Sequence, residues 1–140
     1  LDWDQTHFAS ASLNYALPRG GGPGIGRIRP LEGFEAAVNW SYGSGFPYSP
    51  PSGASVIPKV NSERYPWTMQ TDLKLSRRFW LDPLEFRASV TVYNLFNRTN
   101  IDRIFDTAYY QSTGEPGGSM GNPGAYSPAR HFLFSLDVYF

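Results

Sequence analysis

Five segments of the chain alternate apolar and polar residues with a period of two, and this pattern limits the fold more than any other feature. In the final segment, HFLFSLDVYF, apolar residues occupy every even position from 132 to 140, while Ser135 and Asp137 fall between them. Successive side chains of a strand point to opposite faces of its sheet, so each segment is predicted to be a strand with one apolar face. The predicted strands lie near residues 7–17, 34–42, 67–79, 84–96 and 131–140.

These segments have the length of strands that cross a lipid bilayer. A tilted strand needs about 9–11 residues to cross, whereas strands of soluble domains average about 5–6. Proline and glycine interrupt the sequence throughout, and no apolar stripe with helical spacing is sustained. We therefore expect an all-β fold, a transmembrane antiparallel β-barrel to which this chain contributes about five strands.

The connections between the predicted strands are of unequal length. Trp80–Pro83 reads as a tight turn, whereas residues 43–66 and 97–129 are long and rich in glycine, proline, serine and tyrosine. In an antiparallel sheet both long loops emerge on one side and the tight turn on the other, as in outer-membrane barrels with short periplasmic turns and long extracellular loops. The connection at 18–32 departs from this pattern, because it falls on the turn side and is not short.

Aromatic residues gather at both ends of the predicted strands, where membrane interfaces favour them. Strand middles carry mainly alanine, leucine and valine, a sorting that a soluble β-sandwich does not require. The loop-side group is Trp40, Tyr42, Tyr65, Trp67, Tyr93, Phe96 and Phe132; the turn-side group is Tyr15, Phe34, Phe79, Trp80, Phe86, Tyr139 and Phe140.

Charged residues follow the polar side of the alternation, with one exception. An arginine or lysine at mid-depth in lipid costs about 2–4 kcal/mol, so the polar face is expected to meet water or a plug. Its charges are Lys74, Arg78, Glu85, Arg87 and Asp137. Arg77 instead shares the parity of Leu73 and Leu75, and we expect it to reach the headgroups near the periplasmic end.

Composition and motifs give no sign of catalysis, metal binding or a cofactor. The net charge is zero, which offers no electrostatic reason for nucleic acid as a partner, and the absence of cysteine excludes disulfides and cysteine metal sites. Gly117–Gly121 matches the G-x-S-x-G pattern of esterases but is surrounded by glycine and proline with no helix signal. We expect no catalytic residue, no metal site and no cofactor.

Several short motifs, in order along nearly the whole chain, resemble the last strands and loops of TonB-dependent outer-membrane receptors. They are DWDQTHF, WSYGSGFPYSP, NSERYPWTMQTDLKLSRRF, VTVYNLFNRTN and ARHFLFSLDVYF. The resemblance implies that residues 1–140 form the C-terminal part of a larger barrel of about 22 strands, closed by further strands and filled by an N-terminal plug domain outside this chain. Physical reasoning agrees that more strands are needed, because five strands leave two open edges in hydrocarbon. The rest of the barrel belongs either to the same polypeptide or to another chain.

The resemblance implies uptake of a scarce nutrient, a siderophore, oligosaccharide or peptide, through the bacterial outer membrane. Its partners would be outer-membrane lipid, the remainder of the barrel, the barrel assembly machinery and, through the plug, the TonB complex. Tyr139 and Phe140 would carry the signal that the assembly machinery reads. Loop residues suited to ligand capture are Tyr48, Tyr65, Tyr109, Tyr110 and Gln111, because aromatic faces with a nearby amide suit all three ligand classes.

Two alternatives stay open from the sequence. The chain could be a structural barrel component that scaffolds surface assemblies without transport. It could also be a soluble β-sandwich binding module, in which a second sheet would cover the apolar face.

Overall fold

The computed structural model describes residues 4–51 and 60–140, which divide into two compact units. The first, here called the sheet unit, comprises residues 11–40, 71–96 and 130–140. The second, the loop unit, comprises residues 1–10, 41–70 and 97–129. Each unit is described by itself below.

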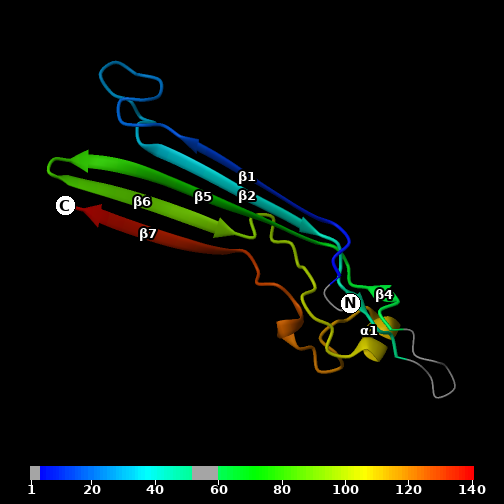
Figure 1. Cartoon of the computed structure of the whole chain (residues 1–140). Helices are drawn as coiled ribbons and strands as arrows, with labels where there is room; N and C mark the ends of the chain where they lie inside the picture. Colours follow the sequence, from blue (N-terminus) through cyan, green and yellow to red (C-terminus); the bar gives the residue numbers. More distant parts are fainter. Residues whose placement is uncertain (1–3, 52–59) are drawn as a thin grey trace. The chain divides into compact units, whose positions relative to one another are not determined.

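One antiparallel sheet of five strands has the order β1-β2-β5-β6-β7 (Figure 1). Its strands are β1 (Phe8–Ala16), β2 (Phe34–Gly43), β5 (Thr68–Leu81), β6 (Leu84–Tyr93) and β7 (His131–Tyr139). They lie where the alternation places them, with small differences at their ends. β6 stops at Tyr93 rather than 96, because Asn94 takes a left-handed φ of 53° and its N–H donates to Asp72 Oδ1 at 2.9 Å.

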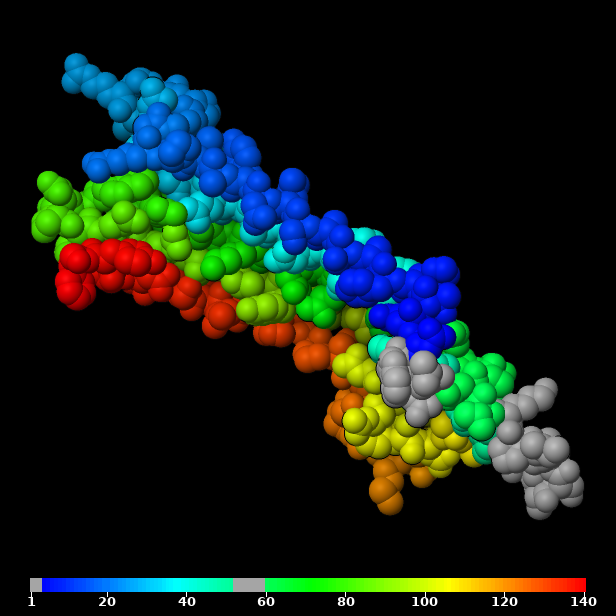
Figure 2. Space-filling view, in the orientation of Figure 1, coloured from blue at the N-terminus to red at the C-terminus, as the bar shows by residue number. Residues whose placement is uncertain are grey.

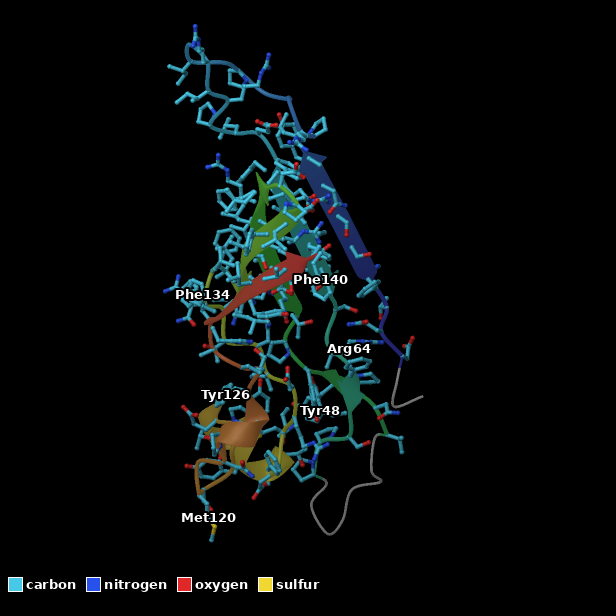
Figure 3. The ribbon with its side chains drawn as sticks, turned by 90° about the vertical axis from the view of Figure 1, so that its left-hand side faces the viewer. Tyr48, Arg64, Met120, Tyr126, Phe134 and Phe140 are labelled. Atoms are coloured by element: carbon cyan, nitrogen blue, oxygen red, sulfur yellow. The ribbon has the colours of Figure 1, made fainter. Side chains whose placement is uncertain are left out.

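The strand register brings the apolar residues of neighbouring strands together on one face. Val90 lies between Leu75 and Phe134, and the same pairing continues along the three strands. Large side chains on this face remain exposed, with 76% of the Phe134 surface and 66% of the Leu136 surface open. Phe134 projects from the ribbon of β7 in Figure 3. Within the described part of the sheet unit, no second sheet or helix layer covers this face.

The opposite face carries polar residues in the same register. Arg87 lies between Arg78 and Asp137. Arg78 Nη2 donates to the Glu35 carboxylate at 2.6 Å, and Arg87 Nη2 lies 3.7 Å from the same carboxylate, so this ion-pair network joins β2, β5 and β6. The charged residues predicted for this face therefore lie together on it.

Both edges of the sheet lack a partner strand within the described residues. β1 and β7 are the outer strands, and their residues are exposed along their whole length. Figure 2 shows them in blue and red along opposite sides of the sheet. The sheet is therefore open in the described part of the chain, with two edges whose backbone groups lack strand partners.

Two types of connection join the strands at one end of the sheet. Asp82 and Pro83 alone separate β5 from β6. The connection 17–33 between β1 and β2 is longer and is held by local bonds: Arg29 Nη1 donates to the Gly22 carbonyl at 2.9 Å. As the sequence indicated, this connection is the exception to the short turns expected at this end of the sheet.

Two short helices in residues 97–129 were not predicted. They are α1 (Thr107–Thr113) and the 3₁₀ helix η1 (Pro123–Ala125). Asp106 Oδ1 accepts the Tyr109 N–H at 2.9 Å, and Gly114 ends the helix at a left-handed φ of 78°. An aspartate and a glycine at these positions are ordinary helix boundary signals, but the segment between them has no apolar stripe. No helix of the described residues has the length and hydropathy needed to cross a membrane.

Gly33 provides a test of the junction before β2. Its φ is 69°, and a Cβ there would lie 2.8 Å from both the Arg78 carbonyl oxygen and the Trp80 ring. Gly33→Ala should therefore lower the free energy of unfolding by about 1–3 kcal/mol, measured by urea unfolding with tryptophan fluorescence. Gly24→Ala is the matched control, because a Cβ there would meet only the Ile28 carbonyl at 3.9 Å. Equal stability of the two variants would contradict the prediction.

Candidate functional site

A short strand pair organises one side of the loop unit. β3 (Pro47–Tyr48) pairs with β4 (Glu63–Arg64), and the Tyr65 N–H donates to the Phe46 carbonyl at 2.9 Å. Gly45 passes so close to Tyr65 that a Cβ would collide with the Tyr65 carbonyl, so this position accepts only glycine. The close approach of Tyr65 thus explains why the loop motif that begins at Ser44 has a glycine at position 45.

Hydrogen bonds and an ion pair attach the start of the described chain to the β3–β4 strand pair. Arg64 Nη2 forms an ion pair with Asp4 at 2.9 Å, and Arg64 Nη1 donates to the Gly45 carbonyl at 3.2 Å. Gln5 Nε2 donates to the Ser44 carbonyl at 2.8 Å. The stretch at 4–7 is therefore fixed against the start of the 44–66 connection.

Asn100 attaches the second long loop to the start of β5. Its amide makes two bonds with the backbone of Met69: Oδ1 accepts the N–H at 3.0 Å, and Nδ2 donates to the carbonyl at 2.9 Å. The backbone carbonyl of Asn100 in turn accepts the N–H of Ser127 at 3.0 Å. Asn100 is buried, and buried backbone groups need hydrogen-bond partners. The side-chain amide supplies these partners to the Met69 backbone in the way that a neighbouring strand would.

Three asparagines of the motifs quoted for the sequence resemblance have a conformational role. Asn61, Asn94 and Asn97 adopt left-handed φ values of 55°, 53° and 51°. Asparagine tolerates this region better than most residues, because its short side chain can bond locally. These residues therefore shape the backbone just before β4 and just after β6.

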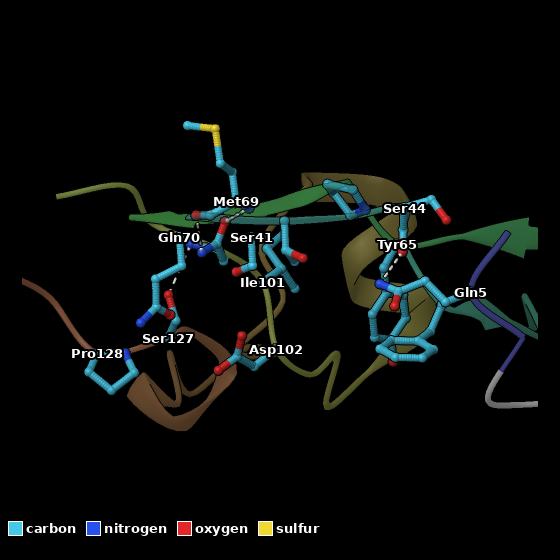
Figure 4. Close-up of a pocket in the computed structure, with 15 residues that line it drawn as sticks. Gln5, Ser41, Ser44, Tyr65, Met69, Gln70, Ile101, Asp102, Ser127 and Pro128 are labelled. Atoms are coloured by element: carbon cyan, nitrogen blue, oxygen red, sulfur yellow. Dashed lines mark hydrogen bonds between the residues drawn. The ribbon is translucent and has the colours of Figure 1, made fainter. Parts of the chain in front are cut away.

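A pocket of about 380 Å³ lies between these anchored segments (Figure 4). Gln5 and Tyr65 lie at one end of it, and Ser127 and Pro128 at the other. The described lining combines hydroxyl and amide groups with two rings and one carboxylate, and contains no lysine, arginine or histidine. The lining is Gln5, Ser41, Ser44, Gly45, Phe46, Tyr65, Pro66, Thr68, Met69, Gln70, Asn100, Ile101, Asp102, Ser127 and Pro128.

Asp102 is the single acidic residue of the described lining. Its backbone N–H donates to the Ala125 carbonyl at 2.9 Å, which fixes it beside η1. Partial burial of the carboxyl raises the pKa of Asp102 above its usual range, although the residue as a whole stays exposed. The pocket therefore offers one hydrogen-bonding carboxylate among neutral polar groups.

Three of the five residues predicted for ligand capture form one tyrosine cluster. The ring of Tyr48 lies 5.4 Å from the ring of Tyr65 and 6.3 Å, edge-on, from that of Tyr110. Tyr65 also lines the pocket, and its hydroxyl accepts the Ile104 N–H at 3.4 Å. The cluster therefore connects the pocket wall to α1.

The other predicted residues lie apart from this cluster. Tyr109 belongs to the first turn of α1, where its carbonyl accepts from Ser112 and Thr113, and Gln111 is exposed. In the sheet unit, Tyr139 pairs with Glu85 and thus falls on the polar face, while Phe140 is fully exposed. Their proposed assembly role stays a prediction.

Sequence reasoning missed most of the pocket lining. Ser41, Thr68 and Gln70 follow the polar parity of their strands, so the alternation contained a signal for them. Gln5, Asp102 and Ser127 gave no such signal, because they converge only through folded loops.

The residues that could suggest catalysis or metal binding lie in ordinary structural settings. Ser119 of the G-x-S-x-G match is in a turn that closes with the Asn122 N–H bonded to the Gly117 carbonyl at 3.0 Å. His131 stacks on Tyr93 in the sheet unit, with ring centres 4.8 Å apart. Residues 4–51 and 60–140 contain no cluster of three histidine, cysteine, aspartate or glutamate residues suited to a metal.

Comparison of the chain with models of protein families, with curated proteins and with solved structures finds no match. The likeness to TonB-dependent receptors thus stays a prediction from short motifs.

The tyrosine cluster generates a pH prediction. Burial, followed by the neighbouring Tyr48 and Tyr65, raises the pKa of Tyr110 above its ordinary value of 10. Above pH 10 the unfolded chain releases this proton while the folded chain keeps it, so stability falls as pH rises through the interval up to the raised pKa. Tyr110→Phe should lose stability less steeply than the wild type as the pH rises above 10, measured by thermal unfolding. Tyr109→Phe is the control and should keep the steeper wild-type loss; identical slopes for both variants would contradict the prediction.

Proposed function

We propose that this chain forms part of the wall and the external loops of a bacterial outer-membrane transporter of the TonB-dependent receptor type. The observation that carries the proposal is the apolar face, which runs in register over β5, β6 and β7 and has no covering layer within the described part of the sheet unit. Such a face needs either a protein layer or hydrocarbon against it. Lipid supplies that cover along the whole length of a barrel strand.

The opposite face supports the same reading. The network of Glu35, Arg78 and Arg87 requires a wet or polar environment, since charges cannot meet hydrocarbon at mid-depth without a large cost. A soluble sandwich also has one wet face, so the polar side alone does not separate the alternatives. Together the two faces match the lipid side and lumen side of a barrel wall.

The aromatic residues of the sheet unit support a lipid interface, with a correction. Phe79 and Phe86 pair on the apolar face near the β5–β6 turn, as a turn-side girdle requires. Trp80 instead lies on the polar face, where its Nε1–H donates to Glu85 Oε2 at 3.1 Å. The alternation of side chains along β5 places Trp80 on the polar face. An aromatic residue near a strand end therefore belongs to a lipid-facing girdle only if it also lies on the apolar face.

The loop-unit pocket suits a neutral, hydroxyl-rich ligand. Ser41, Thr68 and Gln70 can donate and accept hydrogen bonds, and Tyr65 offers an aromatic surface. No cation of the described lining would compensate an anionic ligand, which disfavours negatively charged iron chelates. Among the nutrient classes considered, we therefore propose an oligosaccharide.

Spin labels on neighbouring residues of β7 test the membrane assignment. Phe134 and Ser135 are adjacent but lie on opposite faces, and the chain itself contains no cysteine. In membranes, a label at Phe134→Cys should be relaxed mainly by oxygen, which concentrates in hydrocarbon. A label at Ser135→Cys should be relaxed mainly by a water-soluble nickel chelate. A Phe134→Cys label shielded from both reagents would favour the soluble sandwich.

Binding and uptake of maltoheptaose test the transport proposal. Ser41→Trp should fill the pocket and weaken binding at least tenfold in titration calorimetry. Ser119→Trp, the same change at an exposed turn outside the pocket, should leave binding unaltered.

Uptake separates transport from scaffolding. Cells should accumulate labelled maltoheptaose, and a proton ionophore should stop the accumulation. Binding without energy-dependent accumulation would favour the scaffold alternative, and a lack of both would reject the ligand class.

A further inference from the structure

Arg77 is the one charged residue on the apolar face of the described strands. In the register it lies beside Ala88 of β6, between the pairs Leu75–Val90 and Phe79–Phe86. A lone arginine costs stability in such a setting unless its charge is compensated. Its position therefore calls for a specific explanation.

No anion of the described residues compensates Arg77. The ion pairs of the sheet unit lie on the polar face, around Glu35 and Glu85. The Arg77 Nε atom is buried without a hydrogen-bond partner. The guanidinium carbon lies 4.9 Å from the centre of the Phe79 ring, which attracts the cation but leaves its donors unused.

A shallow apolar hollow of about 380 Å³ adjoins Arg77. Its other lining residues come from β2, β5, β6 and β7, and all of them except Ser76 and Ser89 are apolar. The lining is Phe34, Leu75, Ser76, Arg77, Ala88, Ser89, Val90 and Phe134. One cation at the margin of an apolar hollow matches the two parts of a phospholipid, a phosphate and an acyl chain.

The lean of the Arg77 side chain agrees with this match. Phe79 is two residues nearer the β5–β6 turn, so the cation–π contact directs the guanidinium toward that end. Arg77 precedes the last residue of β5, Leu81, by four positions, which is roughly 13 Å of strand and roughly 9 Å of depth at the usual tilt. An arginine side chain covers much of this distance, so its donors approach the headgroup level.

We propose that Arg77 and the adjoining hollow form a binding site for one phospholipid, with the phosphate on the guanidinium and an acyl chain over Ala88 and Val90. The site rests on the proposed function, because it requires lipid against this face. A guanidinium suits the ligand, since its planar donors bind two phosphate oxygens at once. The complementary charge favours a lipid over a second apolar protein surface.

Native mass spectrometry of the protein produced from its own gene and purified in mild detergent tests the site. The probes are palmitoyl-oleoyl phosphatidylglycerol and the diacylglycerol with the same chains. The wild type should bind phosphatidylglycerol at least tenfold more tightly than diacylglycerol, and millimolar inorganic phosphate should not displace it. Free phosphate competing equally well would overturn the lipid assignment.

Three variants locate the site. Arg77→Gln should remove the tenfold preference, whereas Lys74→Gln, which removes a charge from the opposite face of the same strand, should keep it. Ala88→Phe should reduce binding of both lipids by filling the hollow. If Arg77→Gln fails to fold, the wild-type preference and the Ala88→Phe result decide the question. An unchanged preference in Arg77→Gln, or none in the wild type, overturns the site.

The outcomes also separate this site from the proposed function. A label at Phe134→Cys that is exposed to lipid, combined with no preference for phosphatidylglycerol, rejects the site alone. A shielded label rejects the membrane wall and the site together.

Discussion

The structure depends on strand register. Because side chains alternate along every strand, a shift of one residue between neighbours would place arginines among phenylalanines on both faces. The observed pairing of Val90 with Leu75 and Phe134 avoids this for every charged residue of β5, β6 and β7 except Arg77, and the polar pairs follow from the same alignment. The hydrogen bond between Ser89 and Ser135 at 2.6 Å, between strands distant in sequence, follows from that alignment too.

Much of the sheet could be predicted because its signal is local. Alternation over nine or more residues identifies a strand and assigns each side chain to a face without knowledge of the rest of the chain. The ends were less predictable, since Asn94 stops β6 through a left-handed backbone and a bond to Asp72 on another strand. Trp80 was placed in the turn-side aromatic group because it lies near the end of its strand. The alternation of side chains puts it on the polar face instead, opposite Glu85, so position along the strand alone did not predict its surroundings.

The loop unit could be predicted only in part. Tyrosines at 48, 65 and 110 were recognised as a type of residue suited to ligands, but their approach depends on the β3–β4 pair and on α1. The pocket lining was harder to find, because Gln5 and Asp102 converge from distant loops without periodicity. Short-range caps such as Asp106 and Gly114 gave a usable but weak signal for α1.

The attachment at Asn100 has a consequence for the substitutions that the second long loop can accept. One amide holds the loop to the backbone of Met69, and this attachment makes no demand on the side chains between residues 103 and 124. Substitutions in that stretch can therefore change the surface that the loop presents while the attachment to Met69 stays the same.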